Sequence, residues 1–287
     1  MMLKIYSYAK ITLFLDVIDK RPDNYHNVKI ILQNIDLSDF LLVNPLPYPY
    51  FILKSNYSSI PLEENLIYKA YKSFIEKTEI KIGLYVYHLK RIPIQGGLGG
   101  GSSNACSILF ALNFLSKAGL KREELSNIAI NLGSDIPFFL YGGTSLVEGK
   151  GEKVTKLPNL SNYLVLLITP PFGINTKHIY SQIDPKILGC HLDWDYVIKK
   201  VKDNKISTPY NFFENIVFKI YPLLKDIKEK LLEFTPYVSL TGTGSSIFAL
   251  FENKKDLNIA KEKISSYIKG CKIRICGFTN KGFLILR

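Results

Sequence analysis

The sequence predicts an α+β protein built from two domains. Strand-like and helix-like segments follow one another without the strict strand–helix alternation that is typical of a doubly wound parallel sheet. The chain also has 287 residues, which exceeds the usual size of a single hydrophobic core. Because the pattern changes near residues 159–162, we expect a first domain over residues 1–158 and a second over residues 159–287.

The first domain is expected to begin with strands and to place a helix between them. Runs rich in β-branched, aromatic and alternating apolar residues predict strands at residues 5–17, 28–32, 40–43 and 80–86. A turn is expected at residues 21–24, and a proline-rich connection at residues 44–49. Apolar residues recur at helical spacing from Leu66 to Ile75, which predicts an amphipathic helix there.

The rest of the first domain is expected to combine helices and short strands. Helices are predicted at residues 104–115 and 123–132, and a glycine follows each of them. Strands are predicted at residues 144–147 and 154–157, on either side of a glycine-containing turn.

An apolar strand at residues 163–169, closed by two prolines, is expected to open the second domain. Helices are then predicted at residues 194–201, 214–234 and 257–268, and Pro222 is expected to kink the second of them. Strands are predicted around a turn at residues 241–246, and again at residues 273–278 and 283–286.

The composition favours an ordinary globular protein of the cytoplasm. Hydrophobic residues make up 47% and charged residues 22%, which is sufficient for a large core. The four cysteines form no CxxC pair, so we expect reduced thiols and no structural zinc site. The N-terminus lacks the pattern of a signal peptide, and no apolar stretch is long enough to cross a bilayer. We therefore expect no membrane partner.

The net charge of +12 is compatible with anionic ligands, including nucleotides, phosphorylated metabolites and nucleic acids. It is equally compatible with lysines scattered over solvated faces, because no block of five or six basic residues occurs. No segment interleaves aromatic and basic residues as single-strand binders do, so nucleic acid is not the expected partner.

The most informative segment is a glycine-rich loop between a strand and a helix. Its residues expected to bind phosphate are Pro93, Gly96, Gly97, Leu98, Gly99, Gly100, Gly101, Ser102 and Ser103. Free backbone amides in such a loop, together with the positive end of the following helix, form a cradle for a nucleotide di- or triphosphate. Ser102 stands where a Walker loop needs lysine, and no GxGxxG is present, so the two best-known phosphate loops are excluded.

Three segments resemble the motifs of the GHMP kinase superfamily. They are AKITLFL with RPDNYH at residues 9–26, PIQGGLGGGSSNAC at residues 93–106, and LTGTGSS at residues 240–246. The RPDNYH context is most similar to the family members that act on a cytidine-diphosphate-linked sugar alcohol. The resemblance implies a ribosomal protein S5 domain 2-like N-terminal domain and a ferredoxin-like C-terminal domain, in a monomer or homodimer.

The activity that this resemblance implies is ATP-dependent phosphorylation of the 2-hydroxyl of 4-(cytidine 5'-diphospho)-2-C-methyl-D-erythritol, in non-mevalonate isoprenoid precursor biosynthesis. It assigns Asp135 as the catalytic base and Lys10 as its partner. A carboxylate can accept the proton that the attacking alcohol loses, and an ammonium beside it keeps it ionised. Mg²⁺ is expected with ATP, with Ser102 or Ser103 as a candidate ligand.

The resemblance also assigns residues to the two substrates. At the adenine end of ATP it places Asn65, Leu66 and Lys90. For the acceptor, it places Tyr25 and His26 against cytosine, with Tyr180 as a second aromatic wall, and adds Thr176, Gly242, Thr243 and Gly244. An aromatic face suits a pyrimidine because stacking tolerates different bases.

Two departures from the family pattern stand out. Asn24 replaces a glycine in the turn, which asparagine tolerates because it accepts positive φ. Phe212 replaces an aspartate, which could alter how the substrate is positioned. Two alternatives stay open: another small-molecule kinase of the same family, of the mevalonate or homoserine type, and a non-catalytic nucleotide- or RNA-binding module.

Overall fold

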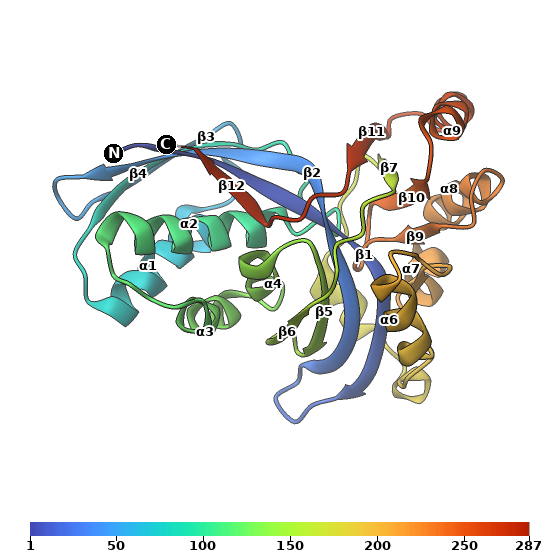
Figure 1. Ribbon diagram of the computed structural model, residues 1–287, viewed down its shortest axis with the longest axis horizontal. Coiled ribbons are helices and arrows are strands. Elements are labelled where there is room, and N and C mark those ends of the chain that lie inside the picture. Colours follow the sequence, from blue (N-terminus) through green and yellow to red (C-terminus); the bar gives the residue numbers. More distant parts are fainter. Residues whose placement is uncertain (287) are drawn as a thin grey trace.

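The computed structural model describes residues 1–286, which form two β-sheets with helices packed against them (Figure 1). The first sheet has the strand order β12-β1-β2-β4-β3, and β5, β6 and β8 extend it beside β2 and β1. Its strands are β1 (Leu3–Lys20), β2 (His26–Leu46), β3 (Phe51–Ser55), β4 (Gly83–Leu89), β5 (Thr144–Gly149), β6 (Lys153–Lys156), β8 (Tyr210–Asn211) and β12 (Phe283–Leu286). The long strands β1 and β2 are antiparallel and lie at the centre of this sheet.

One face of the first sheet is covered by helices (Figure 1). These are α1 (Leu66–Thr78), α2 (Gly100–Ser116), α3 (Arg122–Leu132) and α4 (Ile136–Tyr141), with a short 3-10 turn η1 (Leu62–Glu64) ahead of them. α2 is apolar almost all round and lies deepest, and a hydrogen bond of 2.7 Å joins its Ser107 to Ser7 of β1. α2 is therefore fixed directly above the strand that carries Lys10.

The second sheet has the antiparallel order β11-β7-β10-β9, and α8 and α9 pack against it. Its elements are β7 (Leu164–Thr169), α8 (Pro222–Leu232), β9 (Val238–Leu240), β10 (Ile247–Phe251), α9 (Lys254–Tyr267) and β11 (Lys272–Gly277). If the four strands of this sheet are numbered by their order in the chain, they lie side by side in the order 4-1-3-2, which is the ferredoxin-like arrangement. The expected α+β class and the ferredoxin-like second sheet are thus confirmed.

A segment between β7 and α8 bridges the two sheets. It contains α5 (Thr176–Ser181), η2 (Pro185–Ile187), α6 (Trp194–Lys202) and α7 (Glu214–Ile220). The expected division at residue 158 falls between β6 and β7, where the chain passes from the first sheet to the second, and it stays a prediction. Two later strands, β8 and β12, return to pair with β1.

Several predicted elements are wrong in extent. The strands expected at residues 28–32 and 40–43 are one strand, β2, because its pairing with β1 continues through the polar residues Asn34 and Asp39. Both of these side chains are buried and hydrogen-bonded, so they hide the apolar alternation without ending the strand. β3, α4 and α5 were not predicted, since six residues or fewer show little periodicity.

Two helix boundaries also differ from expectation. The helix predicted at residues 214–234 is broken at Tyr221 into α7 and α8, and Pro222 starts the second helix, where its missing N–H costs nothing. α2 begins at Gly100, four residues earlier than the predicted start at residue 104. Gly100 and Gly101 therefore belong to the first turn of the helix, and Gly99 is its N-cap.

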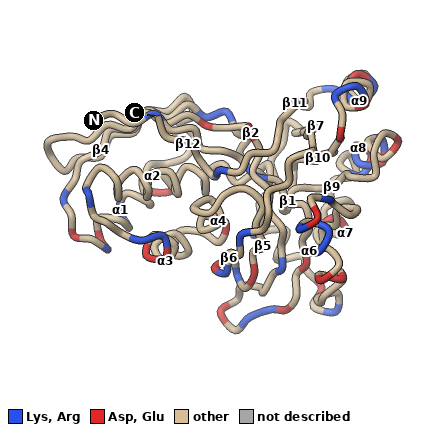
Figure 2. The backbone as a smooth tube through the Cα atoms, in the orientation of Figure 1, with Lys and Arg blue, Asp and Glu red and all other residues tan. Residues whose placement is uncertain are grey.

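The charged residues are spread over the molecule (Figure 2). α6, α8 and α9 each carry both basic and acidic residues, as the sequence shows, so the net positive charge is not concentrated on one helix. Among the helices within residues 1–286, none combines the length and apolar character that a membrane span requires.

Candidate active site

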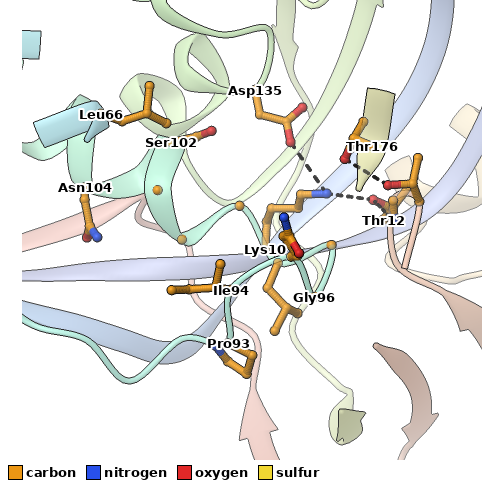
Figure 3. Close-up of a pocket in the computed structure, with 18 of the residues that line it drawn as sticks. Lys10, Thr12, Leu66, Pro93, Ile94, Gly96, Ser102, Asn104, Asp135 and Thr176 are labelled. Atoms are coloured by element: carbon orange, nitrogen blue, oxygen red, sulfur yellow. Dashed lines mark hydrogen bonds and ion pairs between the residues drawn. The ribbon is translucent and has the colours of Figure 1, made fainter. Parts of the chain in front are cut away.

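A cleft with a volume of about 480 Å³ lies where β1, the glycine loop, α2 and α5 meet (Figure 3). Most of the predicted site residues line it: Lys10, Asn65, Leu66, Lys90, Pro93, Gly96, Gly97, Leu98, Gly99, Gly100, Gly101, Ser102, Asp135, Thr176, Tyr180, Gly242 and Thr243. These residues come from both sheets and from segments more than 200 positions apart in the chain. The fold thus gathers three of the predicted motifs at one cavity.

The glycine loop turns its carbonyl groups into the fold and leaves its amides free. Every carbonyl oxygen from Gln95 to Leu98 accepts a hydrogen bond from another segment; Lys10 N, for example, donates to Leu98 O at 3.0 Å. Within the described chain, no hydrogen bond uses the amide N–H groups of residues 96–102. Such a row of unpaired donors at the start of a buried helix is a binding site for an anion.

Two glycines of the loop are required by its geometry. Gly97 has φ +73°, and a Cβ there would stand 1.9 Å from the carbonyl oxygen of Thr241. Gly99, the N-cap of α2, has φ +67°, and its Cβ would stand 2.8 Å from the Phe139 ring. A side chain at either position would push the loop away from the segments that hold it.

The predicted catalytic residues Lys10 and Asp135 lie close together in the cleft, with Lys10 beside the glycine loop (Figure 3). Lys10 Nζ lies 3.7 Å from Asp135 Oδ2 and donates to Thr12 Oγ1 at 3.1 Å. The Lys10 side chain is 4% exposed, whereas that of Asp135 is 41% exposed. Asp135 occupies the N-cap position of α4, but its side chain makes no capping bond. Its carboxylate therefore faces the cleft instead of stabilising the helix.

Burial of the Lys10 side chain lowers the pKa of its ammonium group, and the charge and hydrogen bond of Asp135 oppose that shift. Thr12 Oγ1 also accepts a hydrogen bond from Gly242 N at 3.1 Å, so one hydroxyl joins the lysine to the loop at residues 241–244. Lys10 is held in place from the strand, the glycine loop and this third segment.

Asn65 and Lys90, which are predicted to lie at the adenine end of ATP, have partners of their own. The Asn65 side chain is the N-cap of α1 and accepts from Ile67 N at 3.0 Å. Lys90 Nζ donates to the buried carboxylate of Asp39 at 2.5 Å. Asp39 was not among the predicted site residues.

At the opposite end of the cleft, which we call the aromatic end, Tyr180 lines the cavity and His26 contacts its ring. The His26 ring lies 5.3 Å from the ring of Tyr180, measured between centroids. Burial lowers the pKa of His26, with a contribution from nearby Lys20, which favours the neutral ring. Thr176 and Thr243 meet in a hydroxyl–hydroxyl hydrogen bond of 3.0 Å beside these rings (Figure 3).

Four predicted site residues do not line the cavity: Tyr25, His26, Ser103 and Gly244. Ser103 is fully buried and donates toward Gly282 O at 3.5 Å. Tyr25 lies at the tip of the β1–β2 hairpin, is 53% exposed, and has the Lys150 ammonium 5.1 Å above its ring. Ser102, unlike Ser103, lines the cleft.

Comparison with known proteins places this arrangement in a family. Residues 65–143 match the model of the GHMP kinases N terminal domain, and residues 190–270 match that of the GHMP kinases C terminal domain. A 4-diphosphocytidyl-2-C-methyl-D-erythritol kinase of Clostridium tetani (strain Massachusetts / E88) is 39% identical over 271 residues, covering 92% of this chain and 96% of its own. The chain belongs to the GHMP kinase family.

Solved structures agree with this membership. A 4-(cytidine 5'-diphospho)-2C-methyl-D-erythritol kinase superposes with a TM-score of 0.79 at 27% identity, covering 96% of this chain and 99% of its own. A homoserine kinase from Cytophaga hutchinsonii superposes with a TM-score of 0.75 at 18% identity, covering 99% of this chain and 97% of its own. The second likeness shows that the fold is shared, and the predicted resemblance to GHMP kinases is confirmed.

Sequence reasoning missed several residues of this GHMP kinase that line the cleft. Thr12, His88, Gln95, Asn104 and Phe213 are among them. Thr12 could have been found, since it stands two residues after Lys10 on a strand and so shares its face. His88 and Asn104 carry no such local signal, because only the packing of α2 on β4 brings them together.

The structure also shows where Phe212, which replaces an aspartate of the family pattern, lies. This residue is 1% exposed, and its ring lies 5.8 Å from that of His191, in a second hollow outside the cleft. The next residue, Phe213, is the one that lines the cleft, 4.8 Å from Tyr180 between ring centroids. An aspartate at position 212 of this backbone would lie away from the cavity.

Proposed function

We propose that this GHMP kinase uses ATP to phosphorylate the 2-hydroxyl of 4-(cytidine 5'-diphospho)-2-C-methyl-D-erythritol, a step of the non-mevalonate (methylerythritol phosphate) route to isoprenoid precursors. The names of the curated relatives and of the similar solved structure support this substrate. The observation that carries the chemistry is the Lys10–Asp135 pair at 3.7 Å, in the same cleft as a row of free amides.

The proposed reaction is an in-line transfer of the terminal phosphoryl group. The amides of residues 96–102 and the N-terminus of α2 bind the oxygens of the triphosphate. Asp135 accepts the proton of the attacking hydroxyl, and its half-exposed position leaves room for that group. The Lys10 ammonium offsets negative charge that develops on the transferred group, and because it is buried, water screens this interaction little.

Magnesium fits this arrangement as a partner of ATP. Among the described residues, no group of three or more His, Cys, Asp or Glu side chains could form a protein-only metal site. Mg²⁺ commonly needs only one or two protein oxygens beside phosphate and water, and Ser102 and Asp135 can supply them. When bound, the ion would neutralise charge on the phosphates.

The acceptor is proposed to bind at the aromatic end. Tyr180 lines the cleft and the His26 ring contacts it at a tilt of 45°, while Tyr25 is exposed at the hairpin tip. The hydroxyl groups of Thr176 and Thr243 and the backbone at Gly242 border the path from this end to Asp135. Cytosine would occupy the aromatic end, and the sugar alcohol would extend toward the catalytic pair.

The test is ADP release under Mg-ATP with four acceptor conditions: the CDP-linked methylerythritol, mevalonate, homoserine and none. We expect rapid ADP release with the first alone, and ³¹P NMR should show a new phosphomonoester at the 2-position. Faster reaction with mevalonate or homoserine would assign another activity within the family. Absence of ADP with every acceptor, while ATP still binds, would support a non-catalytic nucleotide-binding module.

A further inference from the structure

Asp39 is a buried carboxylate that the proposed chemistry does not use. It lies on β2, is 0% exposed, and accepts four hydrogen bonds. Its Oδ1 accepts from the amides of Arg91 at 2.6 Å and Ile92 at 2.8 Å. Its Oδ2 accepts from Lys90 Nζ at 2.5 Å and Asn104 Nδ2 at 2.8 Å. Two of these donors, Lys90 and Asn104, line the cleft.

Lys90 is in an unusual place for a cation. A Cβ added to Gly100 would stand 2.8 Å from Lys90 Nζ, so the ammonium lies against the first turn of α2. The positive end of a helix dipole disfavours a cation there, and the side chain is only 11% exposed. The carboxylate of Asp39 offsets both costs. Without it, a buried, unpaired charge would remain beside the helix terminus.

A chain of side-chain hydrogen bonds fixes the geometry around this pair. Asn104 Nδ2 also lies 3.1 Å from His88 Nε2, and His88 Nδ1 lies 3.1 Å from Ser55 Oγ. Because the amide group donates to Nε2, the Nδ1 proton is directed to the serine. β2, β3, β4 and α2 are thereby joined through one network centred on Asp39.

We propose that Asp39 is a positioning residue for the nucleotide, which holds the Lys90 ammonium at the first turn of α2 as a hydrogen-bond donor to the bound ATP. An ammonium has three N–H bonds, and among residues 1–286 only Asp39 accepts one of them. The other two are free for acceptor atoms of the nucleoside. The inference rests on the proposed use of ATP, and it concerns the affinity for ATP and not the transfer step.

The charges of the pair agree with this role. Burial lowers the pKa of Lys90, and the charge and hydrogen bond of Asp39 oppose that shift. Burial alone would raise the pKa of Asp39, but the charge and hydrogen bond of Lys90 and the hydrogen bond from the Arg91 amide hold it well below its usual value. Asp39 thus stays ionised at neutral pH and keeps the donor charged.

The test compares Asp39→Asn, Lys90→Met, the double variant and the matched control Asp36→Asn. Asparagine keeps an oxygen for the two backbone amides but meets Lys90 with an NH₂ group. Asp36 lies on the same strand, is exposed, and within residues 1–286 accepts a hydrogen bond only from Gly277 N, at 2.9 Å. For D39N we expect the KM for ATP and the Kd for a non-hydrolysable ATP analogue to rise roughly 10- to 100-fold. We expect kcat, the KM for the acceptor and the D36N variant to stay near wild type.

The double variant separates positioning from a structural role. If Asp39 acts through Lys90, the double variant has the same affinity for ATP as Lys90→Met alone. This comparison also serves if D39N fails to fold, because the double variant leaves no unpaired buried charge. A D39N protein with lower Tm and unchanged KM for ATP overturns the proposal, as does a double variant much weaker than Lys90→Met.

Failure of the proposed function gives a different result. If the wild type binds the ATP analogue but phosphorylates no CDP-linked alcohol, the acceptor is wrong, and the D39N effect on analogue binding still tests Asp39. If the wild type is an active kinase and D39N binds the analogue as tightly as the wild type does, the proposed role of Asp39 is wrong and the proposed function stands.

Discussion

The two ends of the cleft differ in the kind of group that they present to a ligand. At the proposed phosphate end, the candidate binding groups are backbone amides, and the carbonyls behind them accept hydrogen bonds from distant segments. At the proposed acceptor end, the candidate binding groups are side chains, and Tyr25 is 53% exposed at a hairpin tip. Lys10, between the two ends, is 4% exposed and held from three directions.

The difference teaches which part of the site is general and which is selective. A cradle of amides recognises phosphate without regard to the rest of the ligand, and the homoserine kinase with a TM-score of 0.75 shares the surrounding fold. Side chains on a hairpin can change without disturbing the core, because they make few buried contacts there. Substitutions at the two ends should therefore have separable effects on ATP and on the acceptor.

The largest effect is expected where the two ends meet. Asp135→Asn removes the proton acceptor but keeps the shape of the side chain, so we expect kcat to fall by about 10²- to 10⁴-fold. Because Asp135 makes no capping bond, α4 should persist, but Tm should fall because the buried Lys10 ammonium loses its partner carboxylate. Stopped-flow or quenched assays of ADP formation measure the loss.

Lys10→Met and the double variant complete that experiment. Groups that act together lose activity non-additively, so the double variant should be little worse than the poorer single variant. If Asp135→Asn keeps a tenth or more of the wild-type kcat, the assignment of Asp135 as base is wrong.

A substitution in the loop should act on the phosphate end alone. Gly97→Ala places a Cβ 1.9 Å from Thr241 O at φ +73°, so we expect a loss of about 1–3 kcal/mol of unfolding free energy and weaker ATP binding. Gly119→Ala is the matched control, because Gly119 has φ +72° but open space around its Cβ. Denaturant unfolding and analogue titration measure both variants. Equal losses in the two would show that backbone strain, and not the contact with Thr241, dominates.

Of the parts of the cleft, the glycine loop is the one that the sequence predicts best. Five glycines within residues 96–101, between a strand and a helix, carry their chemistry in a continuous stretch. Lys10 and Asp135 lie far apart in the chain, and their pairing followed from the family motifs before the 3.7 Å distance placed them together. Strands with clear alternation and the helices α1, α2, α3 and α9 were found with modest boundary errors, whereas α8 was predicted as one helix with α7.

The residues that sequence reasoning missed share a physical reason. Asp39 looks like a polar break in a strand, and only tertiary packing brings it into hydrogen-bond contact with Lys90 and Asn104, which line the cleft. The Lys150 ammonium over Tyr25 depends on two turns, 125 positions apart, that meet in the fold. Six-residue helices such as α4 and α5 are too short to show a period. Contacts set by tertiary packing leave no local pattern.

The smallest effect is expected at the exposed tip. Tyr25→Ala removes one aromatic face, and since base–aromatic stacking is worth about 1–3 kcal/mol, the KM for the CDP-linked acceptor should rise roughly tenfold. Tyr25→Phe keeps the ring and should behave as wild type, and neither variant should change the KM for ATP. Steady-state kinetics with each substrate varied in turn measure the difference. An equal rise in both KM values would mean that the hairpin tip acts on the whole cleft, and the two ends would then not be independent.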